Sequence, residues 1–430
     1  MKRFLFILIT FIPFWSFIHA YEVEYNGLKY EINATCATLI KGDKVYSGRI
    51  DIPNEIVYNG RVLPVTEIKG AFKDCVLSYL KIPASVLKMD LDPLVVDEFI
   101  IEDCKNELLF LNSRRGGYFK KPLKYVYIGR DIKYKKPVYS SNGNGYGLFI
   151  REEYGEYIQI EKMVFGNFVK NICYGLCNCC IIKEIDFGNG IESISNNAFI
   201  NTIFKSPLIY PESLKKLHEN GLFQAPSIIL PNSIEIIPYK AFYCCCANNI
   251  TLGNRTKEIG DQGFRSNNIT SIELPSTIER LGKEAFYNCQ SLRTVIINCN
   301  DPNKIKVEKD PFYVDTYIDG ILYVPVGTKK LYQNHPFWGM FFNIQEYDKT
   351  SISSLLCPPN GKIMLNNNTI VLEGFSPNNI VRFYNLNGSL IKTYKISYEG
   401  CLHIDFSQLE KGIYVLSINN VSYKINLNSQ

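Results

Sequence analysis

The hydrophobic positions of this 430-residue chain recur at a fixed spacing over much of its length. Phe242, Phe264 and Phe286 lie 22 residues apart, and alanine or glycine precedes each of them. Before each phenylalanine, a short stretch such as residues 269–274 alternates apolar and polar residues and then meets a proline or glycine. Alternation with a period of two predicts a strand with one buried face, and the proline or glycine predicts where that strand ends.

Further copies of the same unit extend the repeat towards the N-terminus. Phe199 closes one copy, Phe223 supplies a degenerate copy, and Cys177 stands 22 residues before Phe199. Residues 65–72 followed by Cys75 form an opening copy. One unit is too short to bury its own apolar face, so the copies must stack on one another. The pattern therefore predicts a solenoid with a parallel sheet on one face and internal files of phenylalanine and cysteine.

Several of the fourteen cysteines follow this spacing. Four lie three residues after a phenylalanine or its equivalent in the repeat: Cys75, Cys180, Cys245 and Cys289. Such a file predicts small buried side chains, since a free cysteine packs as a small hydrophobic residue. The three consecutive cysteines 244–246 cannot all point inward, so one or two are expected at the surface. Zinc is the alternative interpretation of the cluster Cys173, Cys177, Cys179 and Cys180. That cluster has no second C-x-x-C pair and no nearby histidine, so no metal is expected.

The N-terminus has the order of a secretory signal peptide. Lys2 and Arg3 precede an apolar run over residues 4–18, and Ala20 supplies the small residue at which cleavage is expected. An N-terminal membrane anchor is the alternative. No later run approaches the roughly 20 apolar residues that a spanning helix needs, so no transmembrane segment is expected after cleavage.

The C-terminal part predicts a separate β-domain. A polar stretch and a Pro-Pro-Asn-Gly sequence at 358–361 predict a linker. Short alternating segments follow, separated by turn signals such as Asn387-Gly388. The expected strands are residues 369–372, 380–384, 390–394, 403–406, 413–418 and 421–426. Together they predict a small antiparallel sandwich.

The repeat resembles a known family. Its I-x-x-x-A-F-x-x-C pattern with an L-x-x-I-x-L-P strand is similar to the BspA-like class of leucine-rich repeats in bacterial surface proteins. Residues 25–32, 46–53 and 58–68 resemble the β-rich opening of such proteins, and residues 322–328 with Tyr332 and Trp338 resemble their closing segment. The fold expected is mainly β, a leucine-rich-repeat solenoid with a parallel sheet, a β-rich N-terminal cap and a small C-terminal antiparallel β-sandwich.

This resemblance and the linker divide the chain into six parts. They are a signal peptide (1–20), an N-terminal cap (21–64), a solenoid (65–300) that is irregular over 73–165, a closing segment (301–348), a linker (349–365) and a C-terminal sandwich (366–430). The glycine-rich residues 140–147 are expected to form a loop within the irregular stretch.

Residues 381–391 and 404–416 resemble the C-terminal sorting domain of the type IX (Por) secretion system. The resemblance implies that the outer-membrane secretion machinery is a partner. It also implies that the protein is exported to the outer surface or surroundings of a Gram-negative bacterium, with removal of the domain. Ser389 stands where a basic residue is common in that family. An ordinary C-terminal β-domain is the alternative.

Catalytic chemistry has little support in the sequence. The histidines outside the leader are scattered, and no P-loop, G-x-S-x-G or dinucleotide motif occurs. A net charge of +5 on 430 residues is too small and dispersed to indicate nucleic acid as a partner. We therefore expect no enzyme, no catalytic residues and no cofactor.

The leading hypothesis is an adhesion or binding module for host or neighbouring-cell protein or glycan, which the resemblance implies. The alternative is a structural cell-envelope assembly protein without a soluble ligand. Solenoids present wide faces that suit extended ligands. The candidate binding residues are those expected to point outward from the sheet: Tyr79, Lys81, Lys183, Glu184, Asp186, Asn248, Asn249, Thr251, Thr270, Ser271, Glu273, Arg293, Thr294 and Ile296.

Overall fold

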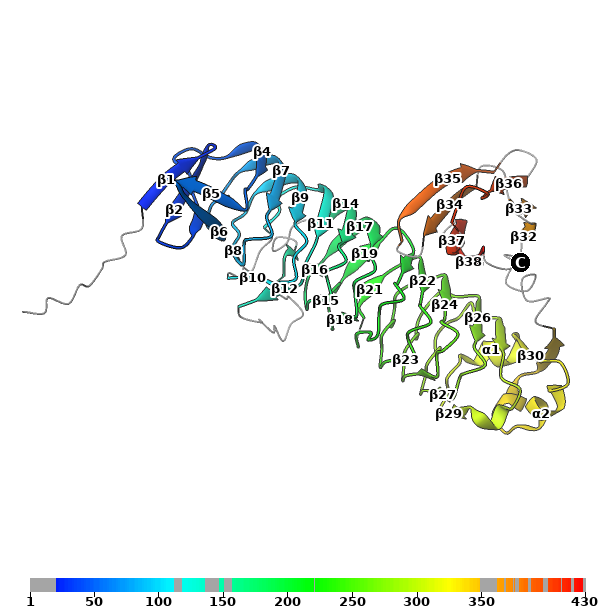
Figure 1. Cartoon of the computed structure of the whole chain (residues 1–430). Helices are drawn as coiled ribbons and strands as arrows, with labels where there is room; N and C mark the ends of the chain where they lie inside the picture. The colour runs from blue at the N-terminus through cyan, green and yellow to red at the C-terminus, as the bar shows by residue number, and fades with distance from the viewer. Residues whose placement is uncertain are drawn as a thin grey trace, which may run out of the picture.

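Figure 1 shows the protein as a computed structural model. The structure describes residues 21–111, 118–135, 147–150, 157–219, 221–348, 362–366, 369–373, 375, 379–385, 388–396, 401–410, 412–418 and 421–427. The expected signal peptide and residues 140–146 of the expected loop lie outside these ranges. Within them, no helix has the length and apolar character that crossing a membrane requires.

The first strands form an antiparallel cap on the end of the solenoid. β1 (Tyr21–Tyr25), β2 (Leu28–Ile32) and β3 (Ala37–Ile40) pair in order, and β5 (Glu55–Tyr58) pairs with β6 (Arg61–Lys69) as a hairpin. The β1–β2 and β5–β6 turns are both Asn-Gly with positive φ at both residues, which is the geometry of tight hairpins. β3 also pairs in parallel with β6, and this pairing begins the stacked part of the chain.

A long parallel sheet follows along the solenoid (Figure 1). It contains, in spatial order, β4 (Ser47–Asp51), β7 (Val76–Ile82), β9 (Val95–Ile101), β11 (Leu123–Ile128), β14 (Ile158–Phe165), β17 (Cys180–Asp186), β19 (Thr202–Phe204) and β21 (Phe223–Gln224). All neighbouring pairs are parallel. The sheet thus runs through residues 73–165, where the repeat pattern is poorest.

Two further parallel sheets carry the solenoid to its end. The first comprises β20 (Leu208–Ile209), β22 (Ser227–Ile229) and β24 (Asn249–Thr251). The second comprises β26 (Ser271–Leu274), β28 (Thr294–Ile297), β30 (Ile321–Pro325) and β31 (Asn343–Tyr347). β24 and β26 lie side by side, so the strands follow one another along the rod.

Short strands form the opposite side of the solenoid. They are β8 (Lys88–Asp90), β10 (Leu108–Phe110) and β12 (Ile132–Tyr134), the pairs β13 (Phe149–Ile150) with β16 (Cys177–Asn178) and β15 (Asn171–Ile172) with β18 (Ser193–Ile194), and then β23 (Ile236–Ile237), β25 (Glu258–Ile259), β27 (Arg280–Leu281) and β29 (Lys306–Val307). The closing segment adds η1 (Pro302–Lys304), α1 (Val314–Ile318), α2 (Lys329–Asn334) and η2 (Trp338–Met340).

The aromatic file predicted from the repeat is present in the downstream solenoid. The rings of Phe242 and Phe264 stack with centroids 5.3 Å apart, and Phe264 stacks on Phe286 at 5.5 Å. Phe312 continues the file at 5.5 Å, and Trp338 closes it at 6.3 Å.

The degenerate copy changes the path of the file. Phe199 contacts Phe204 at 5.3 Å, and Phe223 then lies 5.7 Å from Phe204 and 6.2 Å from Phe242. The aromatic core is therefore continuous there, but Phe199 joins it through two intermediate rings.

The predicted burial of the repeat-position cysteines is also confirmed. Cys75, Cys180, Cys245 and Cys289 are all buried, whereas Cys244 and Cys246 are exposed. Asn267 holds the equivalent position in the turn between Cys245 and Cys289. Its amide nitrogen donates to the carbonyls of Phe242 and Phe264, both at 2.8 Å, and its oxygen accepts from the amide of Ala247 at 2.9 Å.

The C-terminal domain is an antiparallel sandwich, as expected. One sheet contains β32 (Lys362–Asn366), β33 (Thr369–Glu373) and β36 (Cys401–Asp405). The other contains β34 (Ile380–Asn385), β35 (Leu390–Lys395), β37 (Ile413–Ile418) and β38 (Val421–Asn426). β32 was absent from the expected strands. The sandwich has its own apolar core and lies beside the solenoid near β22 and β24 (Figure 1).

Candidate binding surfaces

The predicted binding residues lie on the sheet side of the solenoid but in two separate groups. Tyr79 and Lys81 belong to β7, and Lys183, Glu184 and Asp186 belong to β17, with three strands between β7 and β17. The rest gather on three successive strands. They are Asn248, Asn249 and Thr251 at β24, Thr270, Ser271 and Glu273 at β26, and Arg293, Thr294 and Ile296 at β28.

The first group is largely engaged in contacts within the sheet. The ammonium group of Lys81 lies 2.7 Å from Asp51 and 3.0 Å from Glu102, and these contacts raise the pKa of Lys81. Lys183 pairs with Glu161 at 2.5 Å. Such exposed pairs contribute little to stability, but they leave little uncompensated charge for a ligand.

Two other members of this group are also occupied. The guanidinium of Arg49 lies 3.6 Å from the ring centroid of Tyr79, a cation–π contact. The carboxylate of Asp186 accepts a hydrogen bond from the hydroxyl of Ser389 in the C-terminal domain. Asp186 is therefore not open to an external ligand while that domain is in place.

The second group carries mostly short uncharged side chains. Ser271 on β26 is the register partner of Thr294 on β28. Asn249 lies on β24, next to β26, at the equivalent position 22 residues earlier in the repeat. Glu273 accepts from the amide of Asn298 at 2.7 Å, and Arg293 donates to the carbonyl of Gln290 at 2.8 Å. This part of the face is neutral and rich in hydroxyl and amide groups.

The prediction that Ile296 is exposed was wrong. It is outward by register, between Glu273 and Tyr323, but it is fully buried. An apolar side chain between two longer neighbours is shielded from water, which is favourable. It therefore cannot contact a ligand as the other outward residues can.

A second surface, which was not among the predicted binding residues, is formed by the residue that follows each phenylalanine of the file. These residues are Tyr243, Arg265, Tyr287 and Tyr313, and we call them the aromatic ridge. Their turns are joined by backbone hydrogen bonds from Phe242 to Gly263, from Phe264 to Ala285 and from Phe286 to Pro311. The 22-residue spacing could have revealed Tyr243, Arg265 and Tyr287, because it gives the position after each of Phe242, Phe264 and Phe286. Tyr313 follows Phe312, which lies 26 residues after Phe286, so the spacing does not predict it.

Three of the four ridge side chains contact one another in sequence. The guanidinium of Arg265 lies 4.9 Å from the ring centroid of Tyr287, and the ring of Tyr287 meets that of Tyr313 edge-on at 5.8 Å. Arg265 also pairs with the carboxylate of Glu284. At the other end, the ammonium group of Lys240 lies 5.2 Å from the ring of Tyr243. All four ridge side chains remain partly exposed, so an aromatic and cationic strip faces the solvent.

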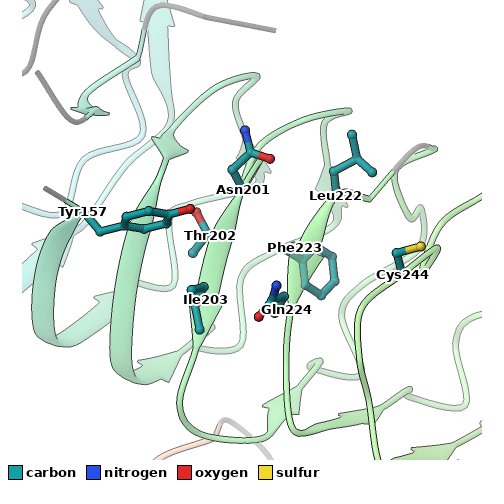
Figure 2. A pocket seen from close by; sticks show the side chains of 8 residues that line it. All are labelled: Tyr157, Asn201, Thr202, Ile203, Leu222, Phe223, Gln224 and Cys244. Atoms are coloured by element: carbon teal, nitrogen blue, oxygen red, sulfur yellow. The ribbon is translucent and has the colours of Figure 1, made fainter. Parts of the chain in front are cut away.

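A shallow depression lies on the degenerate copy, between β19 and β21 (Figure 2). Its volume is about 170 Å³, and it is lined by Tyr157, Asn201, Thr202, Ile203, Leu222, Phe223, Gln224 and Cys244. Sites for drug-sized ligands and cofactors usually measure about 300–1,000 Å³. The depression is too small for an organic cofactor.

The described histidines and cysteines form no metal-binding cluster. Burial lowers the pKa of His218 to about 4, and its ring packs 5.7 Å from that of Phe223. The ring nitrogen of His335 accepts from the amide of Phe337 at 3.2 Å, which gives it a local structural role. Burial raises the pKa of Cys289 to about 12 and that of Cys245 well above its usual value, so both thiols stay protonated. Across the described part of the chain, no three His, Cys, Asp or Glu residues come together as metal ligands.

Two family models match separate parts of the chain. Residues 150–227 and 220–321 match the BspA type leucine rich repeat region in six copies. The solenoid contains a BspA-type leucine-rich repeat region. Residues 357–427 match the secretion system C-terminal sorting domain, so this is an exported repeat protein with a sorting tail.

Solved structures of leucine-rich repeat proteins align with this chain over about three quarters of its length. A leucine rich cell surface protein from Faecalibacterium prausnitzii A2-165 is 11% identical, covers 77% of this chain and 96% of its own, and gives a TM-score of 0.26. The pneumococcal vaccine antigen PcpA is 16% identical, with coverage of 76% and 99% and a TM-score of 0.30. A leucine-rich repeat protein from Bacteroides ovatus ATCC 8483 is also 16% identical, with coverage of 76% and 100% and a TM-score of 0.27. No curated protein matches the chain.

Proposed function

We propose that this protein is a binding module at the cell surface or in the surrounding medium, and that its aromatic ridge holds an extracellular protein or glycan. The proposal depends on one observation, the partly exposed row of Tyr243, Arg265, Tyr287 and Tyr313 across successive turns. Tyrosine and arginine are enriched at binding hot spots, because each combines a large contact area with hydrogen-bonding groups. A strip that crosses several turns suits an extended ligand.

Contacts within the protein also preorganise the Arg265 side chain of the aromatic ridge. Arg265 is held between the ring of Tyr287 and the carboxylate of Glu284, and Glu284 accepts a further hydrogen bond from Gln262 at 2.8 Å. Side chains already held in place lose less conformational entropy when a ligand arrives. The neutral row of Asn249, Ser271 and Thr294 on the sheet side is proposed as a second contact area, for which its hydroxyl and amide groups are suited.

The proposal assigns no catalytic role to the protein. Its functional groups are aromatic rings, hydroxyls, amides and paired charges, and the proposed role requires only that they contact a ligand. The type IX secretion machinery is the proposed partner during export, through the sorting domain.

Capture from a defined panel of extracellular-matrix proteins and immobilised glycans tests the ridge. The double variant Tyr243→Ala/Tyr287→Ala is expected to lose about 30-fold or more in affinity for whichever member binds, since even one hot-spot tyrosine contributes about 2 kcal/mol. Tyr58→Ala, which changes an exposed tyrosine in the N-terminal cap, is the matched control. Unchanged capture by the double variant would remove the aromatic ridge as the binding site.

A second pair of variants tests the sheet side. Ser271→Glu/Thr294→Glu places two charges on the neutral row, and Ser276→Glu/Asn300→Glu places two charges on exposed positions nearby. Loss of capture by the first pair alone supports contact with the sheet side. Ordered self-association of the mature protein, with no capture of any panel member, would instead support a structural role in the cell envelope.

A further inference from the structure

The outward face of the solenoid changes character at β20 and β22. Ile209 and Ile229 are partners in the register, and the next residue along this row is Thr251 on β24. The preceding residues, Leu208 and Ile228, belong to the main core, so strand alternation directs Ile209 and Ile229 outward. Yet they are only 1% and 2% exposed, respectively, and they form an apolar cluster separate from that core.

The C-terminal domain presents a matching apolar pair. Tyr384 on β34 and Val415 on β37 are cross-strand partners. Their neighbours Phe383 and Leu416 face the core of the domain, whereas Tyr384 and Val415 belong to the cluster with Ile209 and Ile229. In a free domain of this size, such positions on the outer face would be exposed to water. Both are buried.

A hydrogen bond and a close backbone approach position the C-terminal domain on the solenoid. The hydroxyl of Ser389 donates to the carboxylate of Asp186 at the end of β17. Gly388 has a φ of +86°, and a side-chain carbon added there would lie 2.7 Å from the carbonyl oxygen of Ile185. A residue that lacks a side chain is therefore needed where the turn approaches the solenoid backbone.

Two buried polar groups indicate that water is excluded from the contact between the solenoid and the C-terminal domain. Burial raises the pKa of Tyr384 to about 12, with a further contribution from the carboxylate of Glu184 on the solenoid. Ser227, an outward residue on β22, is fully buried, and its hydroxyl has no hydrogen-bond partner among the described residues. A hydroxyl left in this state on a sheet face indicates that the face is covered.

We propose that Asp186, Ile209 and Ile229 form a docking site for the chain's own C-terminal domain, and that detachment of the domain uncovers an apolar strip in the middle of the sheet face. Each surface places apolar side chains where polar ones would otherwise face water, and each removes the exposed area of the other. The proposal goes beyond the binding function and does not depend on the aromatic ridge. It reserves Asp186 and its neighbours for the domain while the domain remains attached.

Cleavage between the two parts tests the docking site in the full chain. A specific protease sequence is inserted between residues 348 and 362, the protein is cut after folding, and a dilution series is analysed by size-exclusion chromatography. The C-terminal fragment is expected to co-elute with the solenoid at micromolar concentrations. The separated solenoid is then expected to bind a dye that reports exposed apolar surface, which the uncut protein does not bind.

Variants on each side of the contact make the test specific. Ile229→Asp on the solenoid and Val415→Asp on the domain are each expected to raise the dissociation constant by about 100-fold or more, because each buries an unpaired charge. Ser389→Asp should weaken the contact by charge repulsion with Asp186, whereas Ser389→Lys should preserve it. Ile236→Asp and Ile391→Asp, at exposed positions of the solenoid and the domain, are the matched controls.

Two results would overturn the docking site. One is separation of the wild-type fragments at every concentration, with the circular dichroism of each fragment unchanged from the uncut protein. The other is co-elution of Ile229→Asp, Val415→Asp and Ser389→Asp at the wild-type concentration dependence. Because no external ligand takes part, neither result bears on the aromatic ridge.

Discussion

The upstream half of the solenoid, which contains β7 to β14, and the downstream half, which contains β22 to β26, stack their turns in different ways. Upstream, β7, β9, β11 and β14 are six to eight residues long. Their inward residues Leu80, Phe99, Val126 and Met163 lie 19, 27 and 37 residues apart along the chain. Downstream, β22, β24 and β26 are three or four residues long, and their inward residues lie 22 residues apart. A parallel sheet therefore tolerates variable connections when its strands are long.

The interiors of the two halves differ in the same way. Constant spacing lets Phe242, Phe264 and Phe286 stack nearly parallel, with interplanar angles of 6° and 12°. Upstream, Phe119 stacks on Phe149 at 14° but meets Phe99 at 62°. Phe312 lies 26 residues after Phe286 and still stacks on it at 8°. The repeated contact therefore depends on equivalent positions in successive turns, whereas the upstream rings meet at differing angles.

Buried backbone groups are also satisfied differently. The upstream half uses the fully buried Arg130, whose guanidinium donates to the carbonyls of Pro83, Ala84 and Val86 at 2.7–3.0 Å. The downstream half uses one short side chain in each turn, as Asn267 and Cys289 show. One arginine side chain can donate to several carbonyls of an irregular turn at once. Where the turns repeat, one short side chain in each turn is enough to donate to the carbonyls.

The largest effect is expected from interrupting the aromatic file. Phe264→Ala removes a fully buried ring that stacks on both sides, and it should lower the free energy of unfolding by about 4 kcal/mol through lost burial and cavity formation. Chemical denaturation followed by circular dichroism measures the change. Phe168→Ala, at a site that is 42% exposed, is the control and should change stability by less than about 1 kcal/mol. Equal losses for both variants would contradict a cooperative file.

The next effect concerns the upstream half. Arg130→Met keeps much of the side-chain volume but leaves three buried carbonyls without their donor, and it should reduce the free energy of unfolding by about 3 kcal/mol. Hydrogen exchange should show the loss first in β9 and β11, the neighbouring strands of this half. Lys133→Met removes an exposed cation and is the control. If Arg130→Met matches the control, the turn at residues 83–86 does not depend on this residue.

The sequence predicted the parts of the structure that obey one short period. Spacing alone placed Phe242, Phe264 and Phe286 in a file and Cys245 and Cys289 in a buried column. The upstream strands did not appear as copies because their connections vary in length, although residues 123–128 alternate as a strand should.

Long-range contacts could not be predicted in this way. Ser389 and Asp186 are 203 residues apart, and no pattern in either segment links one to the other. The sequence also did not show which outward positions are covered by other residues. Asp186 is bonded to Ser389 of the C-terminal domain, and Ile296 is buried. The same spacing could have predicted Tyr243, Arg265 and Tyr287 of the aromatic ridge, since each directly follows a phenylalanine of the 22-residue series.

Acid should lower the free energy of unfolding through His218, which packs against Phe223 and Phe242 between the upstream and downstream halves. Burial lowers the pKa of this residue from 6.5 to about 4, so below pH 6.5 the unfolded chain binds a proton that the folded chain does not. Stability contributed by the neutral ring is therefore lost as the pH falls from 6.5 towards 4. The loss at pH 5 should be about 2 kcal/mol.

Comparison with a variant isolates this effect from other titrating groups. His218→Phe keeps an aromatic ring beside Phe223 and Phe242 but cannot bind a proton. The difference in unfolding free energy between the wild-type protein and this variant, measured by denaturation at several pH values, should change by about 2 kcal/mol between pH 7 and pH 5. A difference that stays constant over this range would show that the folded chain protonates His218 as readily as the unfolded chain does.

The smallest effect tests whether asparagine and cysteine are alternatives at one position of the downstream turns. Asn267→Cys should cost about 1 kcal/mol, because a thiol fills the site but replaces only part of the hydrogen bonding to Phe242, Phe264 and Ala247. Cys289 shows that a thiol at this position can donate to a carbonyl of the neighbouring turn, 3.3 Å away. Asn267→Ala should cost about twice as much, since it leaves a cavity as well as unsatisfied carbonyls. Equal costs for the two variants, measured by chemical denaturation, would mean that volume and not hydrogen bonding decides which residue the column accepts.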